Sequence, residues 1–170
     1  MCGWREKDGG MGSCLGSCCF PEYQAIKTTD RVPLRTFNGR VVLAKVVEVC
    51  DGNTITVVTR LDRRERKYRY KVRIAGIDAP ELRTRSVLEK AAAVVVRNRL
   101  RDLTLGKMVT LSCSKEDKYG RILAHVHVIQ SAFDRTGKSV SKTLLREKLV
   151  KPSSKMPFTR EELACIIPDE

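Results

Sequence analysis

Residues Val41 to Thr59 read VVLAKVVEVCDGNTITVVT, and this stretch decides the fold prediction. Val41 to Val49 is a β-branched run, and Thr54 to Thr59 is a second one. Between them stands Asp51-Gly52, and an Asp–Gly step between two apolar runs is a strong signal for a β-hairpin. The stretch therefore predicts two strands joined by a tight turn.

The chain after this hairpin continues the β pattern and adds helices. Lys67 to Ile74 alternates basic and apolar residues, so Arg73 is expected on a polar face, because strand side chains alternate between faces. Ser86 and Glu89 form a capping box that opens an amphipathic helix ending at Gly106. Further elements are expected as strands at 107–113 and 121–128, a helix at 139–150 and a short last helix capped by Thr159 and Glu162.

This order of elements predicts the fold class. Five short strands with a helix between the third and the fourth suit a closed five-stranded barrel of the OB type. We therefore expect a mainly β protein with two to three helices, in the α+β class. Such barrels commonly bind oligonucleotides, but the fold alone does not fix the function.

The composition restricts the class of partner. The 170 residues include 33 Lys and Arg against 20 Asp and Glu, a formal net charge of +13. A surface this basic attracts polyanions, so we expect nucleic acid first and an anionic membrane surface second. Eight of the 14 residues from Arg60 to Arg73 are Lys or Arg, which suits either a solvated face or a track for a phosphate backbone.

The amino-terminal region is expected to be a tail. Residues 1–38 form a Gly/Ser/Cys-rich segment, 39–152 the folded domain and 153–170 a short C-terminal extension. The spacing of the seven cysteines matches no zinc-binding motif, and the amino terminus does not resemble a signal peptide. We therefore expect an intracellular protein with reduced thiols. We also expect a monomer. An alternative is peripheral membrane anchoring through acylation of Gly12 or of Cys14, Cys18 and Cys19.

Three short clusters carry candidate chemistry. They are Asp51 to Thr54 (DGNT), Arg73 to Glu81 (RIAGIDAPE) and Asp117 to Arg121 (DKYGR). Each alone has an ordinary interpretation as a turn or as a loop fixed by Pro80. Their occurrence together, at strand ends that a small barrel would bring close, favours a functional site.

The residue types suit phosphodiester hydrolysis. A phosphodiester gains negative charge as water attacks it, and two guanidiniums offer forked donors that match phosphate oxygens. A carboxylate can accept the proton of the attacking water. A hard divalent cation with oxygen ligands can neutralise the charge and orient the phosphate.

These motifs resemble a known family. The stretch from about Ala44 to Pro152 is similar to the staphylococcal nuclease-like (thermonuclease) domain, in its Asp-Gly-x-Thr turn, its Arg-x-x-x-x-Asp-x-Pro-Glu signature and its Asp-Lys-Tyr-Gly-Arg segment. The resemblance implies a calcium-dependent endonuclease that cleaves DNA or RNA with little sequence preference. It implies Glu81 as general base, with Arg73 and Arg121 as catalytic arginines.

The resemblance also implies a metal site and substrate contacts. Asp78 would be a calcium ligand, Ala79 a ligand through its backbone carbonyl and Asp51 a nearby acid. The implied phosphate contacts are Lys118 and Tyr119.

Two departures from the family pattern leave alternatives open. Asn53 stands where the family usually has a second acid, so we expect weaker calcium binding or another divalent ion. After Val150, the third helix and the substrate-lining tyrosines of the bacterial enzyme have no clear match. The alternative function is a catalytically weak or inactive nucleic-acid-binding module, which would have no evident need for Glu81 together with both arginines.

Overall fold

The computed structural model describes residues 36–61, 66–130, 137–153 and 156–167. Residues Thr36 to Glu170 make up one compact unit. Almost all of the expected tail, including the candidate acylation sites from Gly12 to Cys19, thus lies outside the described residues. Among the described helices, none is long and apolar enough to cross a membrane.

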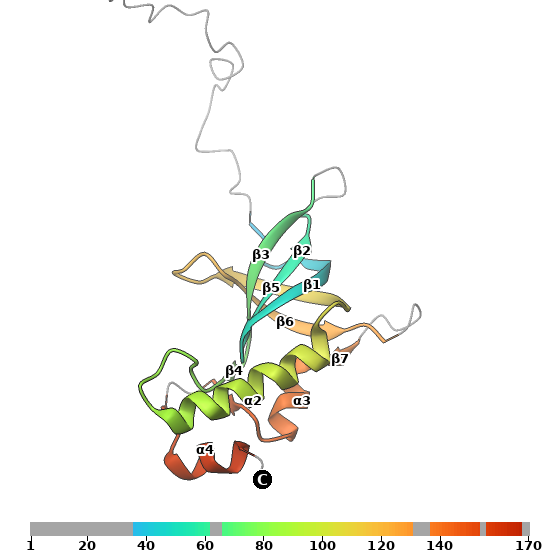
Figure 1. The fold of residues 1–170 in the computed structure, drawn as a ribbon. Coiled ribbons are helices and arrows are strands. Elements are labelled where there is room, and N and C mark those ends of the chain that lie inside the picture. The colour runs from blue at the N-terminus through green and yellow to red at the C-terminus, as the bar shows by residue number, and fades with distance from the viewer. Residues whose placement is uncertain (1–35, 62–65, 131–136, 154–155, 168–170) are drawn as a thin grey trace, which may run out of the picture. The chain divides into compact units, whose positions relative to one another are not determined.

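Five strands close into a barrel, which confirms the predicted fold class (Figure 1). Neighbouring strands pair in the order β3-β2-β1-β5-β6, and β3 pairs with β6 to close the ring. The closing pair is parallel, while the other barrel pairs are antiparallel. The strands are β1 (Val41–Asp51), β2 (Thr54–Thr59), β3 (Tyr68–Ile74), β5 (Met108–Glu116) and β6 (Ile122–Val128).

The first hairpin forms where the sequence predicts it. Asp51 pairs with Thr54, so Gly52 and Asn53 make the turn. The β1–β2 register shifts between Val46 and Glu48 and again just before Asp51. Such bulges bend a strand and increase its twist, which lets β1 curve around the barrel and contact both β2 and β5.

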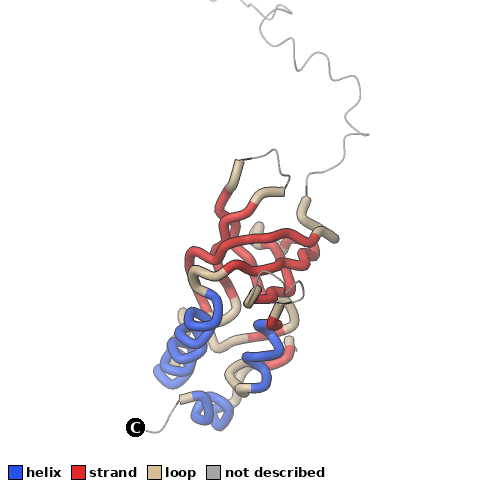
Figure 2. The backbone as a smooth tube through the Cα atoms, turned by 90° about the vertical axis from the view of Figure 1, so that its right-hand side faces the viewer, coloured by secondary structure: helices blue, strands red, loops and turns tan. Residues whose placement is uncertain are grey.

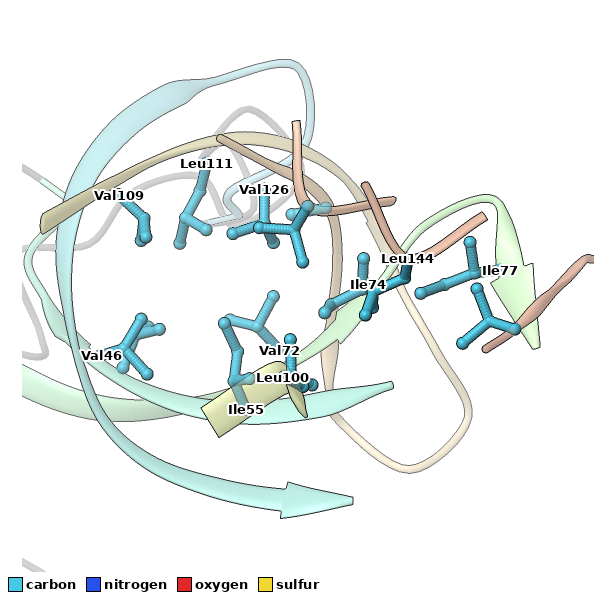
Figure 3. Close-up of a cluster of buried hydrophobic side chains, with 14 of the residues drawn as sticks. Val46, Ile55, Val72, Ile74, Ile77, Leu100, Val109, Leu111, Val126 and Leu144 are labelled. Carbon is cyan, nitrogen blue, oxygen red and sulfur yellow. The ribbon is translucent and has the colours of Figure 1, made fainter. Parts of the chain in front are cut away.

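The core fills the barrel and continues toward the helices (Figure 3). The strand β3 marks one end of this core: Val72 and Ile74 are fully buried, but Tyr68 is 52% exposed. β3 meets β6 only over Val72 to Ile74, so its first residues extend past the closed part of the barrel. The labelled core residues are Val46, Ile55, Val72, Ile74, Ile77, Leu100, Val109, Leu111, Val126 and Leu144.

Within the described ranges, the helices α2, α3 and α4 gather at one end of the barrel (Figures 1 and 2). α2 (Val87–Thr104) begins at Ser86, whose side chain accepts a hydrogen bond from the backbone N–H of Glu89. α4 (Arg160–Ile166) has a complete capping box and adds Leu163 and Ile166 to the core.

The remaining elements are short. α3 (Val140–Arg146) ends earlier than the predicted helix over 139–150. Lys148 takes a positive φ of 55°, and the backbone N–H of Leu149 bonds to the carbonyl of Leu144, which ends the helix before Pro152. The part of the chain that the structure describes also has three two-residue strands: β4 (Ile77–Asp78), β7 (Lys138–Ser139) and β8 (Lys151–Pro152), with β4 paired to β8.

Candidate active site

A cavity of about 760 Å³ lies where the first hairpin turn, the end of β3 and the β5–β6 turn meet. Three separate stretches of the sequence therefore supply one site, as the clusters predict. Lys118 does not line this cavity. The predicted site residues that do are Asp51, Asn53, Arg73, Asp78, Ala79, Glu81, Tyr119 and Arg121.

The barrel pairing brings both arginines next to Thr54. Arg73 is the direct partner of Thr54 in the β2–β3 ladder. Arg121 immediately precedes β6, which runs beside β3, and its Nη1 donates to the Thr54 hydroxyl at 3.3 Å. The guanidinium of Arg121 thus contacts the threonine that is the strand partner of Arg73.

Asp117 fixes the orientation of Arg121. Its Oδ2 accepts from Nε of Arg121 at 2.7 Å, and its Oδ1 accepts from the backbone N–H of both Tyr119 and Arg121 at 2.9 Å. Burial tends to raise the pKa of Asp117, but these hydrogen bonds outweigh it and hold the pKa below its ordinary value. The Nη2 group of Arg121 has no hydrogen-bond partner among the described residues, so it remains available to an anion.

Arg73 is held by a partner of its own. Its Nη2 donates to Oδ1 of Asp78 at 2.6 Å, and both side chains are about one quarter exposed. Asp78 belongs to β4, a few residues further along the chain, so the loop after β3 folds back onto the arginine. The remaining N–H groups of Arg73 have no partner among the described residues.

Glu81 presents a free carboxylate. Its side chain is exposed and makes no hydrogen bond or ion pair with the described residues. Its backbone N–H donates to Oε1 of Glu89 at 3.3 Å, which ties the loop to the first turn of α2. An exposed carboxylate on a tethered loop is free to contact water or substrate.

The hairpin turn packs closely against the second cluster. A Cβ added to Gly52 would lie 2.7 Å from Cβ of Ala79, so a glycine is needed for this approach. Asp51 accepts the Gly52 N–H at 2.7 Å, and the buried Asn53 accepts the Thr54 hydroxyl at 2.9 Å. The turn thereby places both side chains beside the loop that carries Asp78.

Oxygen atoms dominate the possible metal ligands. No three acidic, histidine or cysteine side chains gather into a metal cluster within the described ranges. Two carboxylates, Asp51 and Asp78, and the amide of Asn53 nevertheless line the same cavity. Such hard donors suit calcium, magnesium or manganese when water and phosphate complete the shell.

Tyr119 stands at the edge of the site. It is 70% exposed, with Nζ of Lys118 5.1 Å and the guanidinium carbon of Arg121 5.3 Å from its ring centre. Both cations are close enough for attraction to the ring. Lys118 thus lies over the tyrosine rather than in the cavity wall.

Several lining residues escaped the sequence analysis. Lys71 carried a usable signal, because it shares the polar face of β3 with Arg73. Others carried none, because packing rather than a local pattern brings them to the cavity. These residues are Cys50, Lys71, Leu82, Arg83, Glu89, Met156, Pro157 and Phe158.

Comparison with protein families gives a match. The family described as staphylococcal nuclease homologue matches residues 71–161, just over half of the chain. The matched region runs from β3 to the start of α4 and contains Arg73, Glu81 and Arg121. No curated protein matches the chain.

Proposed function

Because the chain belongs to the staphylococcal nuclease homologue family, we propose that it is a metal-dependent endonuclease acting on DNA or RNA. The observation that carries this proposal is the meeting of Arg73, Arg121 and the free carboxylate of Glu81 in one cavity. A formal charge of +13 favours association with a polyanion.

Glu81 is assigned the proton transfer. Its carboxylate has no protein partner among the described residues, so it can accept a proton from the water that attacks phosphorus. Its tether to Glu89 limits how far the loop moves away from the phosphate. A carboxamide at this position could not accept the proton.

Arg73 and Arg121 are assigned electrostatic stabilisation. Asp78 and Asp117 hold the two guanidiniums in place before substrate arrives, so little reorganisation is needed as charge develops on the phosphate. By analogy with other preorganised donors, each arginine lowers the barrier by about 3 kcal/mol, about a hundredfold in rate.

The oxygen donors fit a hard divalent cation, with calcium as the first candidate. Asp51, Asp78, the amide oxygen of Asn53 and the carbonyl of Ala79 would hold it. When bound, it neutralises phosphate charge. Because Asn53 adds no charge and Asp78 also pairs with Arg73, binding is expected to be weak.

The test is a cleavage assay with each metal. The full chain is incubated with single-stranded DNA or RNA in calcium, magnesium or manganese, and chelation should stop the cleavage. Glu81→Gln should abolish cleavage and preserve binding. Glu161→Gln, an exposed glutamate outside the cavity, is the matched control and should cleave normally.

A binding module without catalysis is the second candidate, and Asn53 favours it. Loss of an acid at the turn removes charge that a metal would need. Tight nucleic-acid binding with no cleavage in any of the three metals would establish this function and exclude the nuclease.

A further inference from the structure

Half of the large apolar side chains that are exposed in the described part of the chain lie on one outer face of the barrel. Val41 and Leu43 on β1 are 68% and 62% exposed, and Val47 on β1 and Met108 at the start of β5 are exposed as well. Lys45 stands among them, because it is the direct partner of Met108 in the β1–β5 ladder. We call these five residues the β1 face. An exposed cluster of apolar side chains marks a surface that contacts another molecule.

The geometry of β1 creates this face. Ala44 and Val46 are buried in the core, so the residues that alternate with them point outward. Both edges of β1 are already paired, one with β2 and the other with β5. A partner therefore cannot add a strand here, and only the outward side chains are available for binding.

The charge that accompanies the apolar side chains is positive. The exposed Lys45 has no hydrogen bond or ion pair with the described residues. The first acid along β1 is Glu48, and Arg69 pairs with it at 3.3 Å. Thr110 and Ser112, the β5 partners of Leu43 and Val41, are uncharged. An unpaired cation among apolar side chains complements a surface that is anionic outside and apolar beneath.

Two other kinds of partner fit the β1 face less well. In a symmetric contact with a second copy, residues at the middle of the face lie close to their own counterparts. Lys45 would then meet another Lys45, and like charges brought together in an interface are unfavourable. Nucleic acid binds through phosphate contacts and aromatic stacking, so the aliphatic Val41 and Leu43 would add nothing to it.

We propose that the β1 face binds an anionic lipid bilayer. Val41, Leu43 and Met108 enter the boundary between the headgroups and the acyl chains, while Lys45 contacts the lipid phosphates. No residue of the β1 face lines the cavity that holds the arginines, and Val41 lies at the opposite end of β1 from Asp51. The lipid surface is therefore separate from the proposed active site and does not depend on nuclease activity.

The test is co-sedimentation of the full chain with sucrose-loaded vesicles. The chain is made in a cell-free system and its mass is measured, so that no acyl group contributes. The vesicles contain phosphatidylcholine alone or phosphatidylcholine mixed with phosphatidylserine. The wild-type chain should bind the mixed vesicles about tenfold more tightly. High salt should weaken this binding without abolishing it, because salt screens the charges but leaves the apolar contact.

Paired variants separate the β1 face from the overall charge. Leu43→Ser should weaken binding to the mixed vesicles on the order of tenfold, and Lys45→Gln about fivefold. Val87→Ser and Lys142→Gln change exposed residues on α2 and α3, so these matched controls should bind close to the wild type. Leu43→Trp should shift its fluorescence to shorter wavelength with the mixed vesicles, whereas Val87→Trp should not.

The contrary outcomes are distinct. Equal binding by Leu43→Ser and the wild type, or equal losses in Lys45→Gln and Lys142→Gln, would overturn the proposal. A wild-type dimer that Leu43→Ser dissociates, without vesicle binding, would assign the face to a second copy. An effect of Leu43→Ser on oligonucleotide binding alone would assign it to nucleic acid. Cleavage without vesicles should be the same in Leu43→Ser and the wild type, so a failure of lipid binding leaves the nuclease proposal intact.

Discussion

Replacing Gly52 by alanine should displace the hairpin turn from the loop that it contacts. The new Cβ would lie 2.7 Å from Cβ of Ala79 and 3.0 Å from Cγ1 of Val96. Neither neighbour is the end of a long flexible side chain, so the backbone must move. Overpacking of this kind reduces the free energy of unfolding by about 1–3 kcal/mol. The same movement separates Asp51 and Asn53 from the loop of Ala79.

Urea unfolding followed by circular dichroism measures this effect. With a denaturant slope of about 2 kcal/mol per M, the midpoint should fall by about 1 M in Gly52→Ala. Ala79→Gly removes the closest contact. The double variant should therefore be more stable than the sum of the two single losses in unfolding free energy predicts, by about 1 kcal/mol.

Two results would refute this reasoning. An unchanged midpoint in Gly52→Ala would mean that the turn does not press against Ala79. If the two changes in unfolding free energy simply add in the double variant, the loss of stability in Gly52→Ala does not arise from the contact with Ala79. Cleavage should fall together with stability in Gly52→Ala and recover in part with Ala79→Gly.

Three further predictions follow from individual contacts. Asp117→Ala frees Arg121 and should lower the cleavage rate by about tenfold or more while KM changes little; an unchanged rate would remove Asp117 as a positioning residue. Asn53→Asp should tighten calcium binding on the order of tenfold by calorimetry and lower the melting temperature in chelator, since it buries a charge; equal affinity would contradict the assigned donor. Glu147, bonded through both oxygens to Arg99, has a lowered pKa because of that hydrogen bond. Its contribution of about 1 kcal/mol should therefore be present at neutral pH and lost as the pH falls below the ordinary value of 4.5. Glu147→Gln should remove this part of the acid sensitivity, and identical pH curves would refute it.

Local signals made most of the fold predictable. The Asp51-Gly52 step marked the first hairpin, and the capping residues Ser86 and Thr159 marked the starts of α2 and α4. Each signal acts within a few residues, so the sequence alone carries it. The length of α3 was predicted wrongly, because an apolar face continues past Arg146 although the backbone turns at Lys148.

The candidate site was predictable only where a motif existed. Arg73, Glu81 and Arg121 stand in recognisable segments, and the barrel brings those segments to one cavity. Met156 to Phe158 have no motif and no periodicity. They reach the cavity because α4 packs on the core through Leu163, and such a long-range contact leaves no pattern in the local sequence.

The parallel ladder between β3 and β6 has a consequence for the order of folding. It joins residues about fifty positions apart, such as Arg73 and Leu123, whereas each hairpin joins near neighbours. Contacts of long sequence separation form slowly, because a large loop must close first. The ladder between β1 and β5 joins residues even further apart, such as Val41 and Ser112. A refolding chain would therefore acquire its hairpins and helical signal early and form these two ladders late.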